Sequence, residues 1–314
     1  MPLRVAVQMD PMESINIAGD SSFAIMLAAQ ERGHVLYHYL APHLSYSDGR
    51  VRAHARPVRV RHQHGDHFEH GEWQVIDLVD DVDVVLMRQD PPFDLSYITA
   101  THLLERVQPH TLVVNDPASV RNAPEKLFVL DYAEYMPPTL ITRSLEETRA
   151  FQAAHGDIVV KPLYGNAGSA VFKIGRDGNN LSALTELFNH VWVEPFMVQA
   201  FLPQVAEGDK RIVLIDGKAT GAINRVPGQG EIRSNLAAGG TALATDLTDR
   251  EREICDALGP ELARRGLLFV GIDVIAGYLT EINVTSPTGI VAIDRFNGTD
   301  TPGIIWDAIE AKVA

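Results

Sequence analysis

The sequence predicts an open parallel α/β domain over residues 1–122, followed by a mixed α+β unit over residues 123–314. In the first part, short apolar runs alternate with helical patterns, which is typical of parallel strands joined by helices. In the second part, the apolar segments 212–224 and 270–284 each turn back at a glycine, which indicates antiparallel hairpins. The segment NDPASVRNAPEKLF is rich in turn-forming residues and predicts the junction between the two parts.

The N-terminal domain is predicted to contain short strands separated by helices. A helix over residues 22–32 follows the capping side chains of Asp20, Ser21 and Ser22 and ends at Gly33. No G-x-G-x-x-G follows the first strand, so a dinucleotide site of the usual kind is not expected. The predicted strands are residues 3–7, 35–39, 82–87 and 111–114, and a second helix is predicted over residues 97–107.

Composition limits the class of partner. The 314 residues carry a formal net charge of −14, and this acidic field repels nucleic acid and anionic membranes. No run reaches the roughly 18 apolar residues of a membrane span, and no signal peptide is recognisable. The single cysteine, Cys255, excludes an internal disulfide and is interpreted as a buried apolar residue. We expect a cytoplasmic protein whose partners are small molecules and copies of itself.

Four histidines, His62, His64, His67 and His70, lie in the polar stretch RHQHGDHFEH. Their spacing would allow a transition-metal site. A solvated loop explains them equally well, because the stretch has no cysteine or buried carboxylate beside it. Both interpretations stay open at this point.

The strongest chemical signal is the segment 269–284, in which two apolar strands meet around Gly277. If this hairpin is symmetric, Asp273 faces Glu281 across the ladder, and Asn283 lies on the same face as Glu281. Two carboxylates among Ile, Val and Leu are costly to bury unless a cation lies between them. Oxygen ligands favour Mg²⁺, which keeps water and phosphate oxygens as its remaining ligands. The hairpin therefore predicts a magnesium site.

A phosphate-binding region is predicted around Lys161, which ends the buried strand 156–162. The loop LYGNAGSA follows and offers free backbone N–H groups, which suit a polyphosphate. Lys126 at the junction is a candidate for a second phosphate cation. The apolar strand and connector 194–203 can present main-chain donors and acceptors to an adenine edge.

Two arginines are predicted to share one face of a second hairpin. If this hairpin closes at residues 216–218, Arg211 lies opposite Ile223 and Asp209 opposite Arg225. Guanidinium groups near a phosphate-binding lysine can stabilise a migrating phosphoryl group and an anionic tetrahedral intermediate. Surface salt bridges with Asp209 are the alternative interpretation.

The segment 226–240 predicts a mobile lid, because it has four glycines and no apolar periodicity. A closed lid excludes water from a reactive acyl phosphate. Helices near residues 250–265 and 302–312 are expected to complete the chain.

Ten motifs follow one another in the order and spacing of a known family. They are QMDPMESINI, DSSFA, RQDPPFD, VNDP, NAPEKLF, VVKPLYGN, GDKR, the lid ending SNLAAGG, GLLFVGID and LTEINVTSPTGI. Through them the chain resembles prokaryotic glutathione synthetases, a family of ATP-grasp ligases, over essentially its whole length. The resemblance implies an N-terminal α/β domain and an ATP-grasp domain, with subdomains near residues 123–200 and 201–314.

The activity that the resemblance implies is ligation of γ-glutamylcysteine and glycine to glutathione, with ATP converted to ADP and phosphate through an acyl phosphate. It also implies Mg²⁺ or Mn²⁺ as cofactor and a homotetramer or homodimer. The implied nucleotide-binding residues are Lys126, Lys161, Gly165, Asn166, Gly168, Gln199, Ala200, Phe201, Leu202 and Asp209. The implied catalytic residues are Arg211 and Arg225, and the metal ligands are Asp273, Glu281 and Asn283. The implied substrate and lid residues are Arg88, Arg233, Asn235, Gly239, Gly240, Ser286 and Thr288.

One position departs from the family's phosphate loop. The loop reads GNAGSAV, so Ala167 replaces a glycine of a pattern closer to G-x-G-G-A-G/S. An alanine held at positive φ costs about 1 kcal/mol, and we expect weaker nucleotide binding or a stiffer loop. Two other functions stay open: a related ligase for another amino acid or peptide, and a nucleotide-binding protein without ligase activity.

Overall fold

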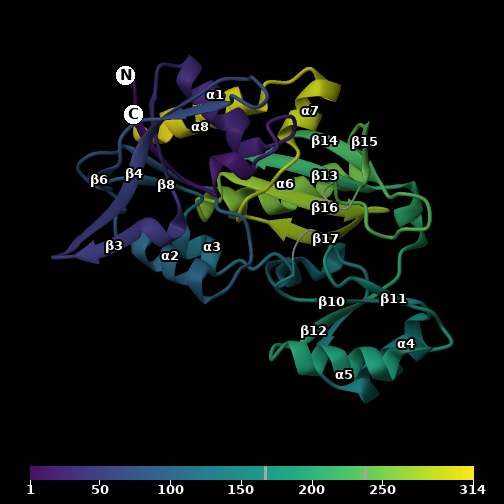
Figure 1. Cartoon of the computed structure of the whole chain (residues 1–314). Helices are drawn as coiled ribbons and strands as arrows, with labels where there is room; N and C mark the ends of the chain where they lie inside the picture. Colours follow the sequence, from purple (N-terminus) through teal and green to yellow (C-terminus); the bar gives the residue numbers. More distant parts are fainter. Residues whose placement is uncertain (166–167, 237–238) are drawn as a thin grey trace.

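The computed structural model contains three β-sheets with helices packed against them, and it describes residues 1–165, 168–236 and 239–314 (Figure 1). The first sheet belongs to the N-terminal part of the chain, a four-stranded sheet to the middle and a five-stranded sheet to the C-terminal part. Figure 1 shows the four-stranded unit at one end of the molecule, below and to one side of the other two sheets.

The first sheet has the strand order β3-β4-β2-β1-β7-β8, and β5 and β6 also pair with β4. Strands β2, β1, β7 and β8 run parallel, which confirms the predicted parallel core. The antiparallel strand β4 pairs with β2 and extends this core. Every second side chain of residues 51–55 is buried. The strands are β1 (Arg4–Gln8), β2 (Val35–Tyr39), β3 (Leu44–Ser47), β4 (Arg50–Val60), β5 (Phe68–His70), β6 (Gln74–Asp77), β7 (Val84–Met87) and β8 (Leu112–Val114).

The helices of this part begin at the predicted kind of cap. Asp20 accepts a hydrogen bond from the backbone N of Phe23 at 2.6 Å at the start of α1 (Ser21–Glu31), and Gly33 follows the helix with φ +82°. Helix α2 (Leu95–Glu105) begins two residues earlier than predicted, because Asp94 caps it. A short helix, α3 (Pro117–Arg121), follows β8.

The four-stranded unit is antiparallel, with the strand order β11-β10-β12-β9. The sequence predicted only its two inner strands, which are β10 and β12. Its elements are β9 (Thr139–Thr142), α4 (Leu145–His155), β10 (Ile158–Pro162), β11 (Phe172–Ile174), α5 (Leu181–Val191) and β12 (Phe196–Ala200).

The five-stranded sheet has the order β15-β14-β13-β16-β17 and contains both predicted hairpins. Three helices accompany it, of which α7 was not predicted. The elements are β13 (Asp209–Ile215), β14 (Lys218–Val226), β15 (Thr241–Ala244), α6 (Asp249–Arg264), β16 (Phe269–Ile275), β17 (Tyr278–Asn283), α7 (Ile290–Asn297) and α8 (Thr301–Val313). The 3₁₀ helices are η1 (Met12–Ser14), η2 (Ala41–His43), η3 (Phe128–Tyr135) and η4 (Pro203–Glu207).

Two clusters of buried apolar side chains join the first sheet to the five-stranded sheet. One contains Val85 together with Ile272, and the other contains Val7 together with Trp306. The four-stranded unit has a smaller cluster of its own, which includes Phe188. The N-terminal and C-terminal parts therefore form one packed body, and the four-stranded unit is a second one.

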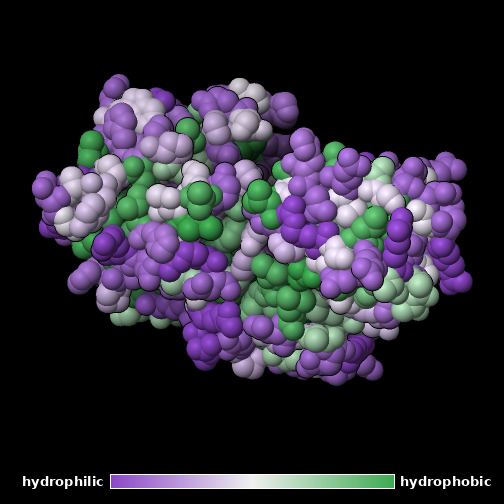
Figure 2. Space-filling model, turned by 90° about the horizontal axis from the view of Figure 1, so that it is seen from below, coloured by the Kyte–Doolittle hydropathy of each residue, from purple (hydrophilic) through white to green (hydrophobic). Residues whose placement is uncertain are grey.

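The surface is mostly polar, in keeping with the charge of the chain. Figure 2 shows apolar side chains in a few patches near the middle of a largely hydrophilic face. No helix in the described ranges is long and apolar enough to cross a membrane.

Asn115 connects the two sheets of the larger body. Its Nδ2 donates to the carbonyl oxygens of Phe269 at 2.7 Å and Val284 at 2.8 Å, and its Oδ1 accepts from the backbone N of Phe269 at 2.8 Å. The side chain is only 3% exposed, so all three bonds are shielded from water. Asn115 thus fixes the end of β8 to the start of β16 and the end of β17.

Replacing Asn115 by alanine should lower the free energy of unfolding by roughly 3 kcal/mol, because buried backbone groups lose their partners. Urea denaturation of Asn115→Ala measures this change. Asn122→Ala is the control, since Asn122 is exposed and bonds only to Ala118 in its own helical turn. Equal stability of the two variants would contradict the connecting role.

Candidate active site

A cavity of about 120 Å³ lies between the four-stranded and five-stranded sheets. Strands β10 and β12 line it from one side, and β13, β16 and β17 line it from the other. Within the described residues, all the predicted nucleotide-binding residues line this cavity. They are Lys126, Lys161, Gly165, Gly168, Gln199, Ala200, Phe201, Leu202 and Asp209. Asn166 and Ala167 lie outside the described residues.

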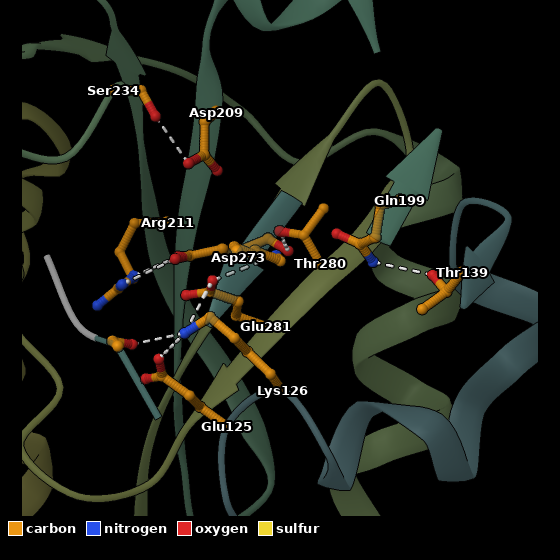
Figure 3. A network of polar contacts seen from close by, with 12 residues as sticks. Glu125, Lys126, Thr139, Gln199, Asp209, Arg211, Ser234, Asp273, Thr280 and Glu281 are labelled. Carbon is orange, nitrogen blue, oxygen red and sulfur yellow. Dashed lines mark hydrogen bonds and ion pairs between the residues drawn. The ribbon is translucent and has the colours of Figure 1, made fainter. Parts of the chain in front are cut away.

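Two lysines meet at Glu281 on one side of this cavity. The ammonium groups of Lys126 and Lys161 each lie 3.4 Å from Glu281 Oε1. Lys126, shown beside Glu281 in Figure 3, also donates to the carbonyl oxygen of Gly165 at 2.7 Å. Burial acts to lower the pKa of both lysines. For Lys126 the carboxylates of Glu281 and Glu125 outweigh burial and raise the pKa, whereas for Lys161 burial prevails and the pKa is below its ordinary value. Two buried cations beside a loop of backbone N–H groups suit an anionic phosphate.

Asp273 lies between the two predicted catalytic arginines. Its carboxylate accepts from Arg211 Nε at 2.6 Å and Arg211 Nη2 at 3.0 Å, and Arg225 Nη2 lies 2.9 Å from its Oδ1. The strand register pairs Asp273 with both Arg211 and Glu281, so the predicted facing of the two carboxylates is confirmed. Burial acts to raise the pKa of Asp273, but the two guanidinium groups outweigh it and hold that pKa well below its usual range.

The predicted pairing of Asp209 with Arg225 is also confirmed. Arg225 Nη2 lies 2.6 Å from Asp209 Oδ2, and Ser234 Oγ of the lid donates to the same oxygen at 2.8 Å. The alternative of surface salt bridges is wrong, because Arg211 and Arg225 are only 6% and 4% exposed. Asp209 Oδ1 is buried and has no protein partner among the described residues. Burial raises the pKa of Asp209, and Arg225 offsets only part of this effect.

A second cavity, of about 190 Å³, adjoins the first, and the two share Asn235 and Glu281. The two arginines, the metal-ligand candidates of β17 and the predicted substrate residues after β17 meet here. The predicted residues that line it are Arg211, Arg225, Asn235, Glu281, Asn283, Ser286 and Thr288. No residue of the four-stranded unit lines it in the described ranges, so this cavity belongs to the larger body.

The residues at the junction of the cavities fit a magnesium ion that arrives with a nucleotide. The described residues contain no group of three His, Cys, Asp or Glu side chains that could hold a metal alone. Glu281 and Asn283 offer oxygens in the second cavity, and the Nδ2 of Asn283 is buried without a partner in the described structure. Magnesium commonly takes one or two carboxylates and completes its shell with phosphate oxygens and water. Asp273 is held by both arginines and would have to release one to serve as a ligand.

Part of the predicted lid lines the first cavity. Arg233, Ser234 and Asn235 line it, and a Cβ on Gly168 would come 3.0 Å from Asn235 Oδ1. A Cβ on Gly240 would lie 1.9 Å from the carbonyl oxygen of Ser234, which explains a glycine there. Gly239 has a φ of +92°, and neither glycine lines a cavity.

Arg88 lies near the second cavity without lining it. It is 5% exposed, donates from Nε to Ser22 Oγ at 3.0 Å and from Nη2 to the carbonyl oxygen of Pro287 at 2.9 Å. Ser286 Oγ donates to the carbonyl oxygen of Arg88 at 3.3 Å. Burial lowers the pKa of Arg88, and no carboxylate within the described residues forms an ion pair with it.

Two of the four histidines, His67 and His70, have local packing partners, whereas His62 and His64 are exposed, and no metal-binding group is found among the described residues. His70 stacks on His38 with ring nitrogens 3.2 Å apart, and His67 bonds to the carbonyl oxygen of Met12 at 2.7 Å. Burial, followed by the charge of His38, lowers the pKa of His70 to about 4. We therefore do not retain the metal-site interpretation of this stretch.

Sequence reasoning missed Glu125 and Ser234. The carboxylate of Glu125 contacts the ammonium group of Lys126 and lines the second cavity (Figure 3), and burial raises its pKa. Its place beside Lys126 in NAPEKLF was a usable signal. Ser234 carried no signal of its own, because its bond to Asp209 spans 25 residues.

Comparison with known proteins identifies the family. Residues 3–121 match the N-terminal domain of prokaryotic glutathione synthetase, and residues 125–298 match its ATP-grasp domain. A glutathione synthetase of Rhodopseudomonas palustris is 58% identical over 314 residues, covering 100% of both chains. The chain belongs to the prokaryotic glutathione synthetase family. Another glutathione synthetase, of Mesorhizobium japonicum, is 54% identical over 312 residues and covers 99% of each chain. As a member of this family, the chain is an ATP-dependent ligase.

Solved structures show the same fold at low sequence identity. D-cycloserine synthetase DcsG matches with a TM-score of 0.71 and 16% identity, covering 99% of this chain and 100% of that one. A RimK domain protein of Sphaerobacter thermophilus, described as ATP-grasp, matches with a TM-score of 0.62 and 18% identity, covering 96% of this chain and 97% of that one. These likenesses establish the ATP-grasp fold that the sequence predicted for the glutathione synthetase family.

Asp273→Asn should lower the free energy of unfolding by about 3 kcal/mol, because two buried guanidinium groups lose their shared anion. Guanidinium chloride denaturation measures the change. Glu261→Gln is a matched control, since Glu261 also contacts two arginines, Arg264 and Arg265, but at the surface. Its stability should change little, because water screens such pairs. If Glu261→Gln lowered the free energy of unfolding by as much as Asp273→Asn, burial would not be the reason for the cost at Asp273.

Proposed function

We propose that this chain catalyses the glutathione synthetase reaction, in which γ-glutamylcysteine and glycine are joined and ATP is converted to ADP and phosphate. The observation that carries this proposal is the 58% identity over the full length of a curated glutathione synthetase. The adjoining cavities support it, because one gathers phosphate-binding lysines and the other gathers arginines and polar residues beside them. A ligase for another amino acid or peptide is the alternative.

The nucleotide binds in the first cavity. Lys126 and Lys161 neutralise the phosphates together with the loop at Gly165 and Gly168, and the main chain of residues 199–202 contacts the adenine. The unpartnered Oδ1 of Asp209 supports a ribose contact, because a ribose hydroxyl would satisfy it. Mg²⁺ or Mn²⁺, held by Glu281 and Asn283 with Asp273 nearby, would supply charge neutralisation at the phosphates.

The ligation proceeds in two steps. The cysteinyl carboxylate attacks the γ-phosphate, forming an acyl phosphate and ADP while Lys161 and Arg211 offset the negative charge. The amine of glycine then attacks the acyl carbon, and phosphate leaves from a tetrahedral intermediate whose oxyanion Arg225 stabilises. Arg233, Asn235, Gly239 and Gly240 of the lid exclude water meanwhile.

The carboxylates of the substrates are assigned to Arg88, Ser286 and Thr288. Arg88 supports this assignment because it is buried with only neutral hydrogen-bonding partners. A charged guanidinium in that setting gains from an anionic ligand.

Phosphate release by the purified protein should require ATP, Mg²⁺, γ-glutamylcysteine and glycine together, with one tripeptide formed per phosphate. The test omits each component in turn and identifies the product by mass spectrometry. Chelation of the metal should abolish release, and added Mn²⁺ should restore it. Release with a different acceptor or donor would support the alternative ligase, and ATP binding without release would indicate a lost activity.

We also propose a cytoplasmic homo-oligomer, a homotetramer or homodimer, with a domain division at residues 122 and 123. Sedimentation equilibrium of the full chain should give two or four times the 34.5 kDa of one chain. A single-chain mass at all concentrations would refute the oligomer.

A further inference from the structure

A third recess opens beside the second cavity and has no role in the mechanism above. It shares Pro91 and Glu125 with the second cavity, and Thr285 also lines both. The recess therefore opens from the second cavity, which the proposed function assigns to the peptide donor. A side chain of the donor that lies at this edge of the second cavity can enter the recess.

The lining of this recess is mainly apolar. Phe93 and Tyr164 face each other as stacked rings with centroids 6.2 Å apart and an interplanar angle of 11°. Leu163 and Val284, both buried, add aliphatic groups together with Pro91 and Pro124. The remaining lining residues are Glu125, Gly165 and Thr285. Aromatic faces and aliphatic groups favour a small apolar or sulfur-containing side chain, since sulfur contacts with aromatic rings are favourable.

The size of the recess also limits which side chains can enter it. Its free volume is about 20 Å³, against about 120 Å³ and 190 Å³ in the two main cavities. About 10–15 Å³ measured in this way accommodates one water molecule, so the recess accepts one or two heavy atoms. A CH₂–SH group fits this limit, whereas a branched aliphatic side chain exceeds it.

We propose that the recess formed by Phe93, Leu163, Tyr164 and Val284 binds the side chain of the donor's C-terminal residue and selects a thiol-sized group. This specificity role rests on the proposed function. The recess combines four segments: the loop after β7, residues 124–125, the loop after β10 and the end of β17. Only the loop after β10 belongs to the four-stranded unit, so the recess is complete only when this loop meets the other three.

A series of donors that differ only in this side chain tests the proposal on the unmodified enzyme. With ATP and glycine saturating, γ-glutamyl-2-aminobutyrate should support a kcat/KM within about tenfold of γ-glutamylcysteine, because a methyl group replaces the thiol. The γ-glutamylserine analogue should fall by more than tenfold, since its hydroxyl loses water in an apolar recess. The γ-glutamylleucine analogue should fall further, because it does not fit.

The variant Phe93→Ala enlarges the recess. We expect the ratio of kcat/KM for γ-glutamylleucine to that for γ-glutamylcysteine to rise at least tenfold, while the KM for ATP stays unchanged. Leu95→Ala is the matched control, because Leu95 lies two residues away and is 80% exposed. That control should leave the ratio as it is.

Three results would overturn the proposal: equal use of the serine and cysteine donors, ready use of the leucine donor by the unmodified enzyme, or an unchanged ratio in Phe93→Ala. The donor series needs no variant, so a folding defect of Phe93→Ala does not remove the test. An enzyme inactive with γ-glutamylcysteine would instead contradict the proposed function itself.

Discussion

The balance of buried charge on the hairpin of β16 and β17 is the constraint on which the site depends. Asp273 and Glu281 face each other between apolar strands, and each is neutralised by two cations from other segments. A slip of one residue in this register would turn both carboxylates to the opposite face and remove the ion-pair partners of Arg211 and Lys161. The five-stranded sheet is thus held in register by electrostatics as well as by its apolar core.

The same charges divide the site into two chemical regions. Lys126 and Lys161 line the first cavity, and Arg211 and Arg225 line the second. Glu281 and Asn235 line both. Phosphoryl transfer from a nucleotide to a carboxylate shifts negative charge between the two reactants, and cations placed beside both can stabilise it.

Local pattern was enough to predict this hairpin and its neighbour. The turn is centred between Ala276 and Gly277, with Ile275 opposite Tyr278 and Val274 opposite Leu279. Asp273 faces Glu281 because a bulge at Thr280 shifts the register by one residue, and this bulge was not predicted from the sequence. Asn115 and the shared core were not predicted for a different reason: their partners lie far away in the sequence, so no nearby pattern records them. Glu125 was missed although its partner Lys126 is the next residue.

The four-stranded unit has an apolar core of its own, whereas the N-terminal and C-terminal parts share theirs. The first cavity is lined from both packed bodies, and no described residue of the four-stranded unit lines the second. A shift of the four-stranded unit against the larger body would therefore reshape the first cavity and the recess at Leu163 and Tyr164. The contacts of Arg211 and Arg225 with Asp273 lie within the larger body and would stay as they are.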